Sequence, residues 1–130
     1  MDHDNSVICT SNQELTVNHL YTIEDYLTLN IQVRSGDFAG SSNFCISKEN
    51  AILISRSLSD MHKKLMGSCA IEDYDSDAHL QIEVNSFGRV LVYGQIGGSH
   101  EDHYMKFKFI SDQAALELLR RLFLSYIKYY

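Results

Sequence analysis

The chain has 130 residues, 45% of them hydrophobic and 22% charged, which suits one folded domain covering residues 1–130 and argues against disorder. Its formal net charge of −6 argues against a nucleic-acid partner, because nucleic-acid binders need a basic face to displace counterions from phosphates. No apolar run reaches the ~20 residues of a membrane-spanning helix, and the polar N-terminus is unlike a secretory signal, so we expect a cytoplasmic protein without a membrane partner.

The first predicted elements are strands. Residues 1–13 carry little pattern and are expected to be disordered, whereas residues 14–23 favour a strand. Residues 27–33 alternate apolar and polar side chains, which is the pattern of a half-buried strand. Residues 35–43 are rich in Gly, Ser and Asn, and this composition predicts a turn.

An amphipathic helix is predicted for residues 48–66. Ser47 is a suitable N-cap, and apolar residues recur at spacings of three and four along the segment. Gly67 is expected to end the helix, because glycine readily adopts the left-handed conformation that follows a last helical turn.

The second half of the chain predicts further strands and a second helix. Residues 69–71 are expected to begin a strand, and three longer β-favouring segments cover residues 80–84, 89–96 and 105–109. Short polar connections join these segments, which favours an antiparallel meander. Residues 112–128 predict an amphipathic helix capped by Ser111 or Asp112.

Together these elements predict an α+β fold. The sequence contains no internal repeat, and the expected architecture is a mostly antiparallel β-sheet with the two amphipathic helices packed on one face. The opposite face of that sheet would be open and polar, and it serves either as a solvated surface or as a binding face. Its expected residues are Thr28, Asn30, Gln32, Arg34, Gln81, Glu83, Tyr93, Tyr104, Lys106 and Lys108.

The cysteines do not form a recognisable site. Cys9, Cys45 and Cys69 are odd in number and widely spaced, without a C-x-x-C pattern, which argues against a disulfide framework or a zinc site. Their apolar neighbours indicate small buried residues in a reducing compartment.

Residues 72–77 are the most acidic segment of the chain. Asp73, Asp75 and Asp77 give the D-x-D-x-D start of a calcium loop, but Ala78 and Val84 stand where that motif has Gly and Glu. The segment is therefore a solvated turn or an acidic epitope for a basic partner, and a metal loop is the weaker interpretation.

Neither catalysis nor a cofactor is indicated by the motifs. Residues 100–103 read His-Glu-Asp-His, but a metal-binding pair of this kind needs a helix, and these residues follow glycines in a predicted hairpin turn. The chain has no G-x-S-x-G sequence and no phosphate-binding loop, and Cys45 has no histidine close by in sequence. We expect no catalytic, cofactor-binding or metal-binding residues, although residues distant in sequence can converge in a small enzyme.

With these elements placed, the layout resembles the WapI-type immunity proteins of bacterial contact-dependent and polymorphic toxin systems. The resemblance covers about Leu27 to Ile127 and rests on scaffold positions. These are Gly36-Asp37-Phe38-Ala39-Gly40, Met61-His62-Lys63-Lys64-Leu65, the turn at Gly88, Val90 to Ile96, and Met105 to Gln113.

This resemblance implies a cytoplasmic antitoxin that binds the toxic C-terminal domain, often a nuclease, of a cognate toxin. It implies no catalytic residues, and it supplies no contact residues. A nuclease inhibitor must cover a basic cleft, so acidic side chains are the candidates for partner binding if their loops lie at one edge of the sheet. They are Glu72, Asp73, Asp75, Asp77, Glu101 and Asp102. The alternatives are a non-catalytic adaptor that uses the open sheet face and, third, a small enzyme.

Overall fold

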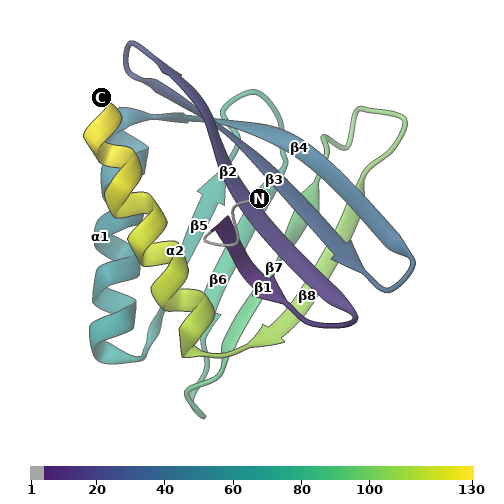
Figure 1. The fold of residues 1–130 in the computed structure, drawn as a ribbon, viewed down its shortest axis with the longest axis vertical. Coiled ribbons are helices and arrows are strands. Elements are labelled where there is room, and N and C mark those ends of the chain that lie inside the picture. The colour runs from purple at the N-terminus through teal and green to yellow at the C-terminus, as the bar shows by residue number, and fades with distance from the viewer. Residues whose placement is uncertain (1–4) are drawn as a thin grey trace.

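The computed structural model describes residues 5–130, which form four strands and a helix and then four more strands and a helix (Figure 1). In chain order the elements are β1 (Ser6–Cys9), β2 (Gln13–Ile23), β3 (Tyr26–Ser35), β4 (Phe38–Ser47), α1 (Lys48–Lys64), β5 (Gly67–Glu72), β6 (His79–Val84), β7 (Val90–Ile96), β8 (Met105–Ser111) and α2 (Gln113–Tyr126), followed by a 3-10 turn at Ile127–Tyr129. The α+β class is confirmed. The order of elements repeats although the sequence does not.

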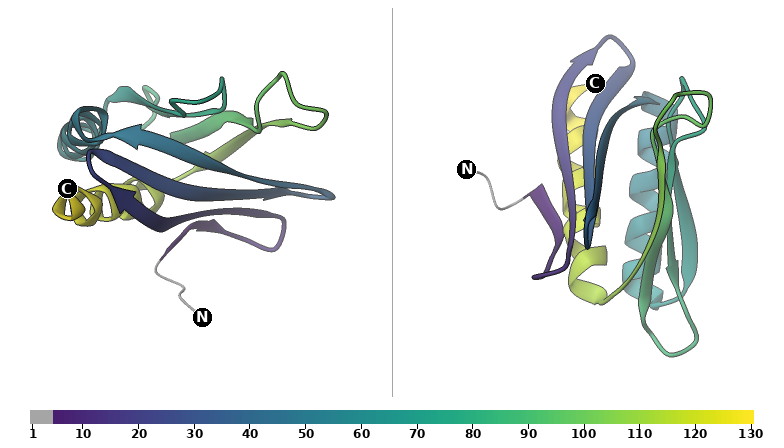
Figure 2. Two further views of the ribbon diagram at one scale, coloured as in Figure 1. Left: turned by 90° about the horizontal axis from the view of Figure 1, so that it is seen from above. Right: turned by 90° about the vertical axis from the view of Figure 1, so that its right-hand side faces the viewer.

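The strands form two sheets where the sequence analysis expected one. Strands β1 to β4 make an antiparallel sheet in sequential order, here called the N-sheet, and β5 to β8 make a second one, the C-sheet. Figure 2 shows the two sheets facing each other. Because each alternating strand turns its apolar side inward, the two sheets together enclose one core. Its fully buried large side chains include Leu15, Leu29, Ile31, Phe44, Leu80, Ile82 and Phe109.

Two strands were missed by the sequence analysis. Strand β1 pairs with β2 and buries Val7 and Ile8, so disorder is the wrong prediction for residues 5–13, while residues 1–4 lie outside the described part of the chain. Strand β4 replaces most of the turn predicted at 35–43, and it pairs with β3 along its whole length. An edge strand tolerates the Gly- and Ser-rich first half of β4, because only one of its sides needs a partner.

The helices pack side by side along one side of the two sheets (Figure 1). Their apolar stripes are buried as predicted, with Leu58 of α1 and Leu119 of α2 fully enclosed. The backbone N–H of Asn50 donates to the side chain of Ser47, the predicted N-cap. The end of α1 differs from the prediction, since Leu65 takes the left-handed conformation and Gly67 begins β5. No helix within residues 5–130 is long and apolar enough to cross a membrane.

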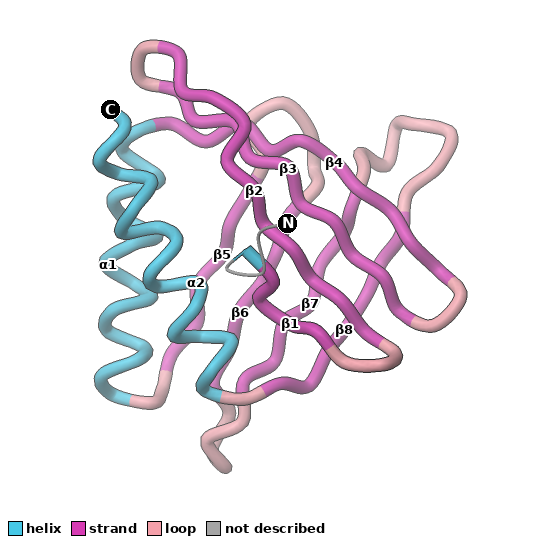
Figure 3. Tube along the Cα trace, in the orientation of Figure 1, coloured by secondary structure: helices cyan, strands magenta, loops and turns pink. Residues whose placement is uncertain are grey.

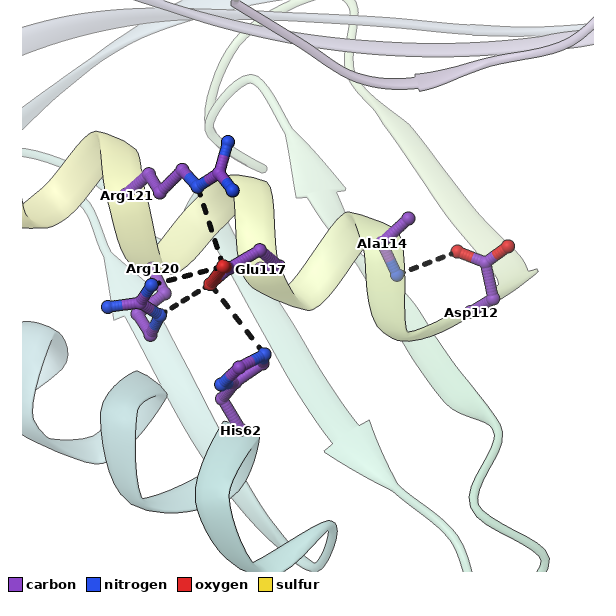
Figure 4. Close-up of polar contacts among 6 residues, drawn as sticks. All are labelled: His62, Asp112, Ala114, Glu117, Arg120 and Arg121. Carbon is purple, nitrogen blue, oxygen red and sulfur yellow. Dashed lines mark hydrogen bonds and ion pairs between the residues drawn. The ribbon is translucent and has the colours of Figure 1, made fainter.

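A cluster of charges joins the two helices (Figure 4). Glu117 of α2 lies 2.5 Å from Nε of Arg120, 3.4 Å from Nε of Arg121 and 3.6 Å from Nε2 of His62 on α1. The hydrogen bond from Arg120 lowers the pKa of Glu117. The same close-up shows Asp112, which caps α2 by accepting a hydrogen bond from the N–H of Ala114. Glu117 offsets one of the two arginine charges, and Arg121, at 67% side-chain exposure, leaves a positive charge at the surface of α2.

Candidate functional site: the acidic end

Three connections lie at one end of the molecule, drawn as loops at the top of Figure 3. They are the β2–β3 turn at residues 24–25, the β5–β6 loop at 73–78 and the β7–β8 loop at 97–104. We call these connections, with the adjoining Glu72 and the paired tyrosines described below, the acidic end. It holds all six acidic residues predicted to bind a partner, together with Glu24 and Asp25, which the sequence analysis missed. The condition set by the sequence analysis, that the two loops share one edge, is met.

Asp77 links the two acidic loops to each other. Its carboxylate accepts hydrogen bonds from the backbone N–H of Ser99 at 2.8 Å and from the Ser99 hydroxyl. It also accepts one at 3.1 Å from the side chain of Gln95, which is only 5% exposed. The hydrogen bonds from Ser99 hold the pKa of Asp77 below its ordinary value. Asp77 therefore fixes the position of one loop relative to the other.

Asp73 anchors the β5–β6 loop to the N-sheet. Its carboxylate accepts hydrogen bonds from the backbone N–H of Cys45 on β4 at 2.9 Å, from the N–H of Asp75 and from the hydroxyl of Ser76. The N–H of Tyr74 donates in turn to the carbonyl of Cys45 at 2.9 Å. The loop thus spans both sheets, and its conformation is set by contacts that are 28 residues apart in sequence.

The six predicted residues consequently divide into two kinds. Asp73 and Asp77 hold the loops in place, which is the role of carboxylates in Asx turns. The side chains of Glu72, Asp75, Glu101 and Asp102 are exposed, and among the described residues they have no hydrogen bond or ion pair. These four free carboxylates give the acidic end its uncompensated negative charge.

A metal site is not formed by these residues. The carboxylates of Asp73 and Asp77 point at protein donors, and His100 and His103 lie in the β7–β8 loop rather than on a helix. Within residues 5–130, no group of three or more His, Cys, Asp or Glu side chains has an arrangement that could hold a metal ion.

Two tyrosines add an aromatic element to the acidic end. Tyr26 and Tyr74 contact each other with ring centroids 5.8 Å apart, and both rings are exposed, that of Tyr74 to 70%. Exposed tyrosines are common anchors in protein interfaces because they combine a large apolar ring with a hydroxyl. The sequence analysis missed this pair, although each tyrosine stands next to an aspartate in the sequence.

Ionisation is disfavoured for the thiols of Cys45 and Cys69. Burial, with the negative charges of Asp75 and Asp73, raises the pKa of Cys45, and burial raises the pKa of Cys69 to about 11. Both effects disfavour the thiolate that nucleophilic attack requires. Of the three cysteines only Cys69 is buried as predicted, since Cys45 is half-buried and Cys9 is exposed.

The open face expected from the sequence is divided between two surfaces. Thr28, Asn30, Gln32 and Arg34 lie on the outer side of the N-sheet. Their expected neighbours on the outer side of the C-sheet include Glu83, which accepts a hydrogen bond from Tyr93. The two outer sides point away from each other (Figure 2), so a partner cannot cover both as one face.

Comparison with known proteins shows a likeness of fold. No protein-family model matches the sequence, and no curated protein matches it. A solved structure described as "Structure of the plant transcriptional regulator PBF-2" superposes with a TM-score of 0.56 at 13% identity, covering 94% of this chain and 79% of that chain. At this identity the match supports the arrangement of strands and helices over nearly the whole chain.

Proposed function

We propose that this protein is an antitoxin that binds and neutralises the C-terminal toxic domain of a cognate polymorphic or contact-dependent toxin. The toxic domain that we propose as its partner is a nuclease. The antitoxin inhibits by occupying the toxin and not by catalysis, and it acts in the cytoplasm of the producing cell. The observation that carries the proposal is the acidic end, where four free carboxylates lie on or beside loops that Asp73 and Asp77 hold in place.

Negative charges on ordered loops suit a nuclease as partner. A nuclease binds phosphates through a basic cleft, and an acidic surface attracts that cleft over a distance and raises the association rate. Loops that are already ordered lose less conformational entropy on binding than mobile loops do. The hydrogen bonds between Asp77 and Ser99 therefore favour tight association as well as the correct placement of charge.

The segments that carry the family resemblance are separate from the proposed binding surface, as expected if they form the scaffold. Residues 36–40 form the turn and start of the β3–β4 hairpin, residues 61–65 end α1, and residues 105–113 run from β8 into α2. The four free carboxylates lie outside these segments. A shared scaffold with separate binding loops is how related inhibitors can recognise different toxins.

Coexpression with a toxin domain tests the proposal. The probe is the C-terminal domain of a large secreted protein encoded directly upstream, first as an active domain in a growth assay and then as an inactive variant for binding. We expect growth to be rescued at near-equimolar levels and a complex of fixed stoichiometry to elute from size exclusion.

Three outcomes would contradict the proposal. An upstream gene of metabolic function, or the absence of a complex, would argue against an antitoxin. Rescue at far below equimolar levels would point to an enzyme instead.

A further inference from the structure

A groove runs between α1 and β5, next to the acidic end. It is a cavity of about 520 Å³, within the ~300–1,000 Å³ of typical binding pockets. Leu53 and Ser57 of α1 line one wall, and Ser68 and Ala70 of β5 line the other. Glu72 and Tyr74 close the end nearest the β5–β6 loop.

The groove exposes the free edge of a strand. In the part of the chain that the structure describes, β5 has β6 as its one neighbour in the C-sheet, so its other edge is unpaired. Ser68, Cys69 and Ala70 all line the groove, although successive side chains of a strand point to opposite faces. Three consecutive residues can line the same groove only if it runs along the backbone edge. That edge is a template for an additional strand.

The walls of the groove suit a segment that is both apolar and basic. Leu53 is 56% exposed, and it offers an apolar contact on the helix side. Glu72 is exposed at one end, and its carboxylate has no hydrogen bond or ion pair among the described residues. Asp75 in the adjoining loop adds a second free negative charge. Among residues 5–130, no basic side chain lines the groove, so the charge of its described walls is complementary to Lys or Arg.

We infer that this groove binds an extended, basic segment of the partner, which pairs with β5 as an additional strand and places an apolar side chain on Leu53 and a Lys or Arg side chain on Glu72. The inference rests on the proposed function for the identity of the partner, which is the toxin domain. It adds the mode of binding, because main-chain hydrogen bonds to β5 give affinity while Leu53 and Glu72 select the side chains.

Hydrogen exchange of the complex is the first test. The probe is the inactive upstream toxin domain, bound to the full chain. We expect the outward-facing amides of residues 67–72, which alternate with those that face β6, to exchange at least about tenfold more slowly in the complex than in the free chain, since an added strand gives them partners. Residues 38–43 of β4, a second free edge far from the groove, serve as the control and are expected to be unchanged.

Matched substitutions are the second test. Leu53→Lys places a positive charge in the groove and is expected to weaken binding by at least about tenfold, or 1.4 kcal/mol, whereas Leu53→Glu is expected to weaken it less. Leu124→Lys on α2 is the control, because Leu124 is also exposed but does not line the groove. Thermal melts establish that each variant folds.

The outcomes separate the two proposals. If the toxin domain binds, but residues 67–72 are not protected and Leu53→Lys behaves like Leu124→Lys, the groove inference is overturned and the proposed function stands. If residues 67–72 become protected in the free chain as its concentration rises, a second copy occupies the groove and the inference is overturned. If the wild-type chain does not bind the toxin domain, both proposals fail.

Discussion

Gly94 gives the most specific prediction about the fold. It lies in the middle of β7, opposite Leu80 of β6. A Cβ at this position would lie far inside the van der Waals contact distance from the His79 carbonyl oxygen, and it would approach the Leu80 Cα to 3.1 Å. These are backbone atoms of a paired strand, so they cannot move aside without opening the β6–β7 pairing. Gly94→Ala therefore forces a shift of the sheet itself.

The size of the effect follows from that clash. Overpacking a core typically costs about 1–3 kcal/mol, and a clash with backbone atoms belongs at or above the upper value. A loss of ~3 kcal/mol is a large part of the ~5–15 kcal/mol that stabilises a domain. It would lower the melting temperature of a chain of this size by about 10 °C. Because β7 continues into Gln95, which contacts Asp77, the distortion also reaches the acidic end.

Gly88→Ala is the matched control. Gly88 has a positive φ of +77° but nothing within 4 Å of an added Cβ, so its substitution costs only the ~1–2 kcal/mol of a left-handed residue with a side chain. Urea unfolding of both variants, followed by circular dichroism, gives the two losses in unfolding free energy. If Gly94→Ala proves no more destabilising than Gly88→Ala, the close pairing of β6 and β7 at this position is wrong.

Two further predictions concern the core and the acidic loops. Leu58→Ala is expected to lower the unfolding free energy by ~2–5 kcal/mol, because Leu58 is completely buried in the core; a loss as small as that of the exposed Leu53→Ala would mean that α1 does not face the core. Asp77 has a lowered pKa in the folded state, so its contribution to stability is present above its ordinary pKa of 3.8 and is lost as the pH falls through the lower folded value. Unfolding free energies measured from pH 7 to pH 2 should therefore fall more steeply for the wild type than for Asp77→Asn, and parallel curves would contradict the Asp77–Ser99 contact.

The helices could be predicted from the sequence because their signals are local. An apolar stripe with a period near 3.6 and an N-cap such as Ser47 are complete within one segment, and the structure has α1 and α2 where these signals place them. Alternation identified β3 and β6 in the same way. It tells which side of a strand is buried, but it does not tell which sheet the strand belongs to. The division into two sheets was missed for that reason.

Strand β4 could not be predicted because its first half has the composition of a turn. Gly40 lies there against Met105 of β8, where an added Cβ would come within 3.2 Å of the Met105 sulfur, so the glycine fits a tertiary contact. A preference that comes from a contact 65 residues away leaves no local pattern.

The sequence identified which acidic residues belong to the candidate site, but it did not identify what each of them does there. All six acidic residues lie at the acidic end, yet only the structure distinguishes Asp73 and Asp77, which hold the loops, from Asp75, which is free. Their partners Cys45 and Ser99 are 28 and 22 residues away in the sequence. The spacing D-x-D-x-D does not reveal such contacts. The same residues therefore also matched the start of a calcium loop.

The most direct test of the account is the rate at which the protein associates with the toxin domain when free carboxylates are removed. One double variant, Asp75→Asn/Asp102→Asn, loses two charges of the acidic end. A control double variant, Asp37→Asn/Asp60→Asn, loses two exposed charges outside it. Each pair of substitutions changes the net charge from −6 to −4. Stopped-flow measurements at several salt concentrations would compare both with the wild type. We expect the first pair to slow association several-fold at physiological salt and to show a weaker salt dependence than the wild type, because at that salt exposed charges act only within a Debye length of ~8 Å. The second pair should behave like the wild type. Equal rates for the two pairs would contradict binding through the acidic end.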